Sequence, residues 1–78
     1  MEFCKGELVV CTAGREKERL MCVVGCDESY VYLCDGGERP MGAPKRKNPK
    51  HIIKTGKSLS ESAMRTDKAL RKELLREV

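Results

Sequence analysis

The sequence predicts a mainly β domain, a small curled sheet or barrel of short strands followed by a C-terminal helix. A chain of 78 residues has room for one hydrophobic core. Short β-prone runs separated by turn residues fill its first half, and a helical pattern is confined to its end. With 40% hydrophobic and 36% charged residues the chain is polar, but not polar enough to predict disorder.

Two strands are expected on either side of a charged turn. Residues 6–14 form a β-prone run with a glycine at each end, and residues 20–26 form a nearly continuous apolar run. In the first run the side chains alternate between two faces, Leu8, Val10 and Thr12 on one and Val9 and Cys11 on the other. Gly25, in the second run, indicates a bulge or a close backbone approach. Residues 15–19 form the turn between the runs.

Further strands are expected towards the middle of the chain. Residues 30–34 are rich in β-branched and aromatic side chains. The Asp-Gly-Gly at 35–37 is a hairpin signal and should lead into a short, proline-interrupted edge strand at 38–41. Residues 42–57 carry two prolines and many charges, which predicts a loop that ends in a brief strand at 51–54.

The last segment has the features of a helix. Thr66 can cap its start, and Asp67 is placed to interact favourably with the positive helix end. Three apolar residues have spacings compatible with one stripe: Ala63, Leu70 and Leu74. Residues 58–61, Ser-Leu-Ser-Glu, have the form of a capping box, which would start the helix earlier. Because a short helix is marginal alone, it should dock on the sheet or fold on a partner.

These elements divide the chain into two segments. An SH3-like five-stranded barrel is the economical arrangement for residues 1–57, with a basic loop at 42–57 included. Residues 58–78 form the helical segment. A core this small seldom contributes more than about 3–5 kcal/mol, so the stability should be modest.

Charge is unevenly distributed along the chain. Residues 1–44 contain five basic residues against eight acidic ones, whereas residues 45–78 contain eleven against four. Within residues 45–57 there are six basic residues and no acid. Such a segment repels itself unless a polyanion neutralises it, so nucleic acid is the natural partner. A solvated, solubilising segment is the alternative.

The five cysteines argue against a disulfide framework, because their number is odd and the start of the chain lacks the pattern of a secretory signal. Their spacing contains no C-x-x-C pair, and His51 is the single histidine, so no metal site is expected. On a regular strand Cys22 and Cys26 would share one face. We expect reduced cysteines that act as small buried hydrophobic residues of a cytoplasmic protein.

Several function classes receive little support. No Walker loop or placeable Ser/His/Asp set is present, so we expect neither an enzyme nor a small-molecule substrate or cofactor. No apolar run approaches the roughly 18 residues of a membrane span. Three aromatic residues, Phe3, Tyr30 and Tyr32, are too few for a base-stacking platform. Binding of nucleic acid should therefore depend on its backbone and shape.

Residues 5–24, KGELVVCTAGREKERLMCVV, resemble a KOW motif, in which an apolar strand runs through a glycine-bearing basic loop into a second apolar strand. The similarity extends through Tyr-Val-Tyr-Leu at 30–33, Asp-Gly at 35–36 and Lys-His-Ile at 50–52, over about 50 residues. Over this length the chain is similar to the small ribosomal-type KOW proteins, and those proteins are related to the L fourteen e group of large-subunit proteins. One position departs from the motif, since Glu18 follows Lys17 where a second glycine is common.

The resemblance implies an RNA-binding protein, with ribosomal RNA of the large subunit as the expected partner, together with other ribosomal proteins or translation factors. Gly14 would present the loop to a phosphate backbone, and alternation would place the loop's basic side chains on one side. The predicted RNA-binding residues are Arg15, Lys17, Arg19, Lys45, Arg46, Lys47, Lys50, His51, Lys54 and Lys57. For His51 a structural role at a strand start is the alternative. The alternative function is a protein-interaction barrel that binds a translation or transcription factor through an acidic surface.

Overall fold

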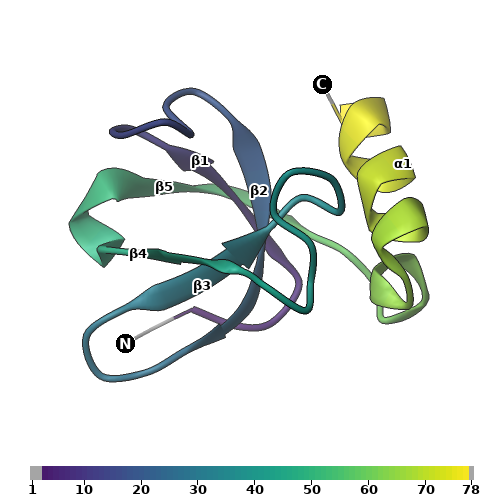
Figure 1. The fold of residues 1–78 in the computed structure, drawn as a ribbon, viewed down its shortest axis with the longest axis horizontal. Coiled ribbons are helices and arrows are strands. Elements are labelled where there is room, and N and C mark those ends of the chain that lie inside the picture. Colours follow the sequence, from purple (N-terminus) through teal and green to yellow (C-terminus); the bar gives the residue numbers. More distant parts are fainter. Residues whose placement is uncertain (1–2, 78) are drawn as a thin grey trace.

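The computed structural model of this protein describes residues 3–77 and contains five strands in one antiparallel sheet (Figure 1). The strand order is β4-β3-β2-β1-β5. The strands are β1 (Glu7–Cys11), β2 (Leu20–Cys26), β3 (Val31–Cys34), β4 (Lys45–Lys47) and β5 (Ile52–Ser58). Two 3-10 turns, η1 (Pro49–His51) and η2 (Ser62–Met64), precede β5 and the helix α1 (Asp67–Glu77) respectively.

The predicted mainly β class with a C-terminal helix is confirmed. The two edge strands of the sheet, β4 and β5, follow one another in the sequence with η1 between them, so the sheet must curl to bring its edges near each other. Within residues 3–77 no ladder pairs β4 with β5. The sheet is therefore a curled, open five-stranded structure rather than a closed barrel.

The first three strands lie where the apolar runs predicted them. The bulge expected at Gly25 is present, because the register between β2 and β3 shifts between Val23 and Gly25. This bulge overturns the expectation that Cys22 and Cys26 share a face. Cys22 is buried, whereas Cys26 is exposed and lies beyond the bulge. A regular alternation does not survive an inserted residue.

The prediction for the fourth strand was wrong. Residues 38–41 form bends and turns, and the strand that pairs with β3 is the basic segment Lys45–Lys47. The predicted loop at 42–57 is thus largely ordered as β4, η1 and a β5 that continues to Ser58. Charge did not prevent strand formation, because both basic strands are sheet edges, where charged side chains can reach water.

The sheet has a hydrophobic cluster on each face. The inner cluster is formed by Val9, Cys11, Met21, Val23, Val31 and Leu33, with Phe3 and Ile52 packed against it. The outer cluster combines Leu8, Cys22 and Cys34 from the sheet with Met64, Leu70 and Leu74 from the C-terminal segment. The predicted alternation of β1 is confirmed, since Leu8 belongs to one cluster and Val9 and Cys11 to the other. The helix α1 completes the outer cluster and lies across that side of the sheet (Figure 1).

The predicted Thr66 cap of α1 is confirmed, and Asp67 joins the start of the helix to the β3–β4 connection. The Ala69 amide donates to the Thr66 hydroxyl at 3.1 Å, and the Met41 amide donates to the Asp67 carboxylate at 2.7 Å. The earlier start predicted from residues 58–61 is wrong, because that segment completes β5 and leads to η2. Gly36 lies directly beneath α1 and has a positive φ of 79°.

Replacement of Gly36 by Ala should separate α1 from the sheet, because a Cβ there would overlap the Asp67 carbonyl oxygen. Gly56→Ala is the matched control, since Gly56 also has a positive φ, 84°, but no heavy atom within 4 Å of the added Cβ. The control should lose about 1–2 kcal/mol from its backbone conformation alone. Urea denaturation should show a clearly larger loss for Gly36→Ala. Equal losses would contradict the close docking of α1.

Candidate functional site

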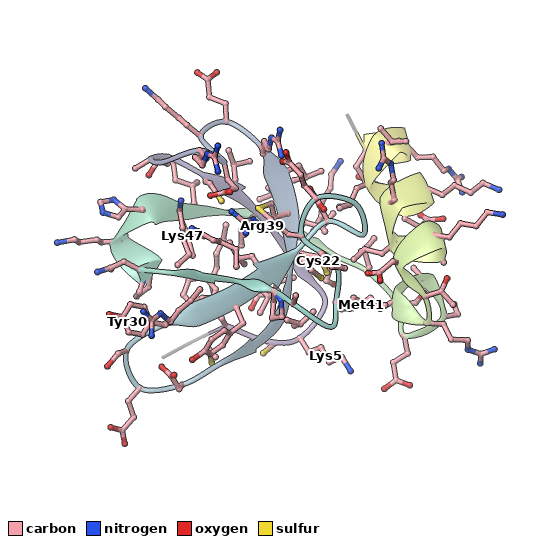
Figure 2. The ribbon with its side chains drawn as sticks, viewed as in Figure 1. Lys5, Cys22, Tyr30, Arg39, Met41 and Lys47 are labelled. Carbon is pink, nitrogen blue, oxygen red and sulfur yellow. The ribbon has the colours of Figure 1, made fainter. Side chains whose placement is uncertain are left out.

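A buried carboxylate with two cationic partners lies between the β1–β2 loop, the β3–β4 connection and β4. The Glu16 side chain is only 2% exposed and accepts hydrogen bonds from Arg39, at 3.0 Å, and from Lys47, at 3.3 Å. Lys47 is itself 8% exposed. Figure 2 labels Arg39 and Lys47, the two residues that contact Glu16.

The ionisation of Glu16 follows from this environment. Burial acts to raise the pKa of the carboxyl, but hydrogen bonds from Arg39 and Lys47, together with their positive charges, outweigh it. The pKa of Glu16 is therefore lowered, and the side chain is a carboxylate at neutral pH. A buried charge of this kind is tolerated because its partners are held against it.

Lys47 also joins β4 to the β1–β2 loop. Its ammonium group donates to the Ala13 carbonyl oxygen at 2.7 Å, in addition to its contact with Glu16. A second link is formed by the Thr12 amide, which donates to the His51 carbonyl oxygen in η1 at 2.9 Å. The β1–β2 loop is therefore fixed beside β4 and η1, although about 30 residues separate them in sequence.

This arrangement gathers basic side chains at one end of the molecule. In the loop, Glu16 points inward while its neighbours Arg15 and Lys17 are exposed. Lys45 and Arg46 come from β4, and Lys50 from η1. We call these five residues the cationic end: Arg15, Lys17, Lys45, Arg46 and Lys50. Among residues 3–77, no carboxylate lies within 4 Å of any of their charged groups.

Tyr30 contacts the cationic end through its ring, and His51 contacts the β1–β2 loop through its backbone. The Arg46 guanidinium lies over the Tyr30 ring, 4.5 Å from its centre, in a cation–π contact (Figure 2 labels Tyr30). Sequence analysis assigned no such role to Tyr30. His51 is half-buried, and its contact to the β1–β2 loop is through its backbone carbonyl.

The remaining predicted binding residues have other partners within the chain. Arg19 forms ion pairs with Glu38 and Asp35. Lys54 pairs with Glu7 at 3.4 Å and lies over the Phe3 ring, and Lys57 pairs with Glu77 at 3.1 Å. Lys47 is buried against Glu16. Five of the ten predicted side chains thus belong to the cationic end, with Lys45 half-buried and the other four exposed. Contacts within the fold are made instead by Arg19, Lys47, Lys54 and Lys57.

The buried network itself was not foreseen. Glu16 was assigned to the charged turn at 15–19 and Arg39 to the edge strand at 38–41, and no sequence pattern links residues 23 positions apart. The available signal was the acid at 16 between two basic residues. In a loop whose side chains alternate, it indicates that Glu16 points opposite to its neighbours.

Three of the five cysteines, Cys11, Cys22 and Cys34, are buried within the two hydrophobic clusters. Burial raises the pKa of Cys22 to about 11 and that of Cys34 to about 12, so both thiols stay protonated at neutral pH. They act as small apolar side chains, as predicted for them. Cys4 and Cys26 are exposed instead, which corrects that prediction for these two. Within residues 3–77 no three His, Cys, Asp or Glu side chains are grouped as metal ligands would be.

Glu18, which follows Lys17 in the β1–β2 loop, has an unusual backbone conformation. Its φ is 68°, and no other non-glycine residue between 3 and 77 has a positive φ. The Glu18 amide donates to the Cys11 carbonyl oxygen at 2.7 Å, which closes the loop on β1. The geometry of this loop therefore suits glycine, and the sequence supplies glutamate.

The chain matches no known family model and no curated protein. In the part of the chain from residue 3 to residue 77, α1 is the longest helix, and neither its 11 residues nor its composition would let it cross a bilayer.

Replacing Glu16 by Gln should destabilise the protein by about 3 kcal/mol, because Lys47 would remain buried without its carboxylate. Lys47→Met should cost less, since Glu16 keeps Arg39. In the wild-type protein the stabilisation is present above the ordinary carboxyl pKa of 4.5 and is lost as pH falls through the lowered pKa of Glu16. Urea denaturation as a function of pH measures both effects. A Glu16→Gln variant with wild-type stability would contradict them.

Replacing Glu18 by Gly should stabilise the protein by about 1 kcal/mol, because relief of the left-handed strain exceeds the added entropy of the unfolded chain. Lys17→Gly is the control, since Lys17 has no positive φ and gains only the entropic cost. Thermal denaturation of the two variants should move in opposite directions. A loss of stability in both would show that the loop is not strained at Glu18.

Proposed function

We propose that this protein is a non-enzymatic, cytoplasmic RNA-binding protein that holds phosphate groups at its cationic end. The observation that carries the proposal is the convergence of five basic side chains with no described carboxylate within 4 Å of their charged groups, although Arg46 also acts electrostatically on Asp27. When a surface of this kind binds a polyanion, it displaces the counterions condensed on that polyanion. The release of these counterions favours binding.

Arginine and lysine at the cationic end have suitable chemistry for phosphate. The Arg46 guanidinium lies over the Tyr30 ring, and its planar edge can donate two parallel hydrogen bonds to one phosphate. Arg15, Lys17 and Lys50 lie on turns, where their exposed side chains can follow a curved backbone. Two of the three aromatic rings are already covered by a cation of the chain, Tyr30 by Arg46 and Phe3 by Lys54, which leaves little aromatic surface for base stacking.

The KOW resemblance supports RNA over other polyanions. The loop that would carry the motif's function is the β1–β2 loop, and two of its basic residues belong to the cationic end. We therefore propose ribosomal RNA of the large subunit as the partner, reached through shape and backbone rather than base identity. An acidic protein, such as a translation or transcription factor, is the competing partner.

The double substitution Arg46→Gln with Lys50→Gln should weaken binding to a structured ribosomal RNA fragment at least about tenfold, because two charged hydrogen bonds are lost. The slope of log K against log salt should fall by about 2. Arg19→Gln with Lys57→Gln removes the same charge from side chains that are already paired. Filter binding across a salt series measures the affinity of each.

The result expected is a large effect for the first variant and a small one for the control. Equal effects would indicate that only net charge matters and would overturn the assignment of the cationic end. A complex with an acidic protein that resists salt, and no RNA binding, would favour the competing partner.

A further inference from the structure

The helix α1 carries its charges asymmetrically. All three of its acids have partners: Asp67 accepts from the Met41 amide, Glu73 pairs with Arg76, and Glu77 pairs with Lys57. Asp67 and Glu77 thus contact other parts of the domain. The outward side of α1 therefore has no unpaired carboxylate among the described residues.

The outward side of α1 carries cations instead. Leu70 and Leu74 are buried against the sheet, so at 3.6 residues per turn Lys68 and Lys72 lie on the opposite side. Leu75 lies beside them and is 66% exposed. Arg71 lies at the edge of this side, with its guanidinium against Gly37 of the β3–β4 connection. We call Lys68, Lys72 and Leu75 the helix face. Within residues 3–77 no carboxylate lies within 4 Å of its two cations.

The helix face and the cationic end lie at opposite ends of the molecule. In Figure 1 the long axis runs from the η1 turn, on the left, to α1, on the right. The Cα extent along that axis is 27 Å. The Debye length at physiological salt is about 8 Å, so two polyanions held at the two ends would repel each other only weakly.

We propose that the helix face is a second phosphate-binding surface, so that one molecule bridges two RNA segments. This inference rests on the proposed function, because it assigns the same ligand chemistry to a second site. Lys68 and Lys72 are four residues apart, where like charges repel one another and a polyanion relieves that repulsion. An anionic membrane is a poorer occupant, because the apolar side of α1, Leu70 and Leu74, is already buried in the domain.

A capture assay tests bridging directly. One RNA duplex is attached to beads, the full-length protein is added, and capture of a second, labelled duplex is measured. The wild-type protein should capture it. Lys68→Gln with Lys72→Gln should reduce capture at least about tenfold while leaving binding to the attached duplex within about threefold, since the cationic end is unchanged.

The matched control is Lys5→Gln with Arg19→Gln, which removes the same charge from the exposed Lys5 and from a side chain paired with Glu38. It should capture like the wild type. Circular dichroism checks that α1 is retained, which is expected because Gln and Lys have similar helix propensities.

The outcomes separate this inference from the proposed function. Wild-type protein that binds the attached duplex but captures no second one overturns bridging and leaves the proposed function standing. Capture that survives Lys68→Gln with Lys72→Gln also overturns it, because the second duplex would then be held elsewhere, for instance by protein dimers. Wild-type protein that binds no RNA at all overturns both.

Discussion

The buried Glu16 carboxylate, held by Arg39 and Lys47, is the interaction on which the arrangement of the surface depends. It connects three segments of the chain: the β1–β2 loop, the β3–β4 connection and β4. Removing charges from water is unfavourable, so this network cannot be loosened without leaving a buried charge unpaired. The network thereby holds the β1–β2 loop in a single conformation against β4.

That geometry determines which basic side chains face solvent. Because Glu16 points inward, Arg15 and Lys17 point outward, and because Lys47 is drawn to Glu16, Arg46 lies on the other side of β4. Side chains therefore alternate between the two sides of the loop and of β4. The Glu16 and Lys47 side chains on one side are buried in the network, and the basic side chains on the other side are exposed. On this account Lys47 contributes to the cationic end by placing its neighbours, not by meeting a ligand.

Sequence reasoning found what local patterns determine and missed what distant contacts determine. The strands β1 to β3, the bulge at Gly25 and the Thr66 cap follow from alternation, glycine and hydroxyl chemistry within a few residues. The strand Lys45–Lys47 was missed because its pairing with β3 and the burial of Lys47 depend on Glu16, about 30 residues away. For the same reason, charge density alone selected ten candidate residues without separating the paired from the exposed.

The central claim is that the Glu16 network joins the β1–β2 loop and the β4–η1 segment into one polyanion-binding end. The most direct test is an NMR titration of the labelled protein with a short RNA duplex at low salt. The account predicts that amide shifts in residues 13–17 and 45–51 change together, with one dissociation constant. Shifts confined to one of these segments, or absent from both, would contradict it.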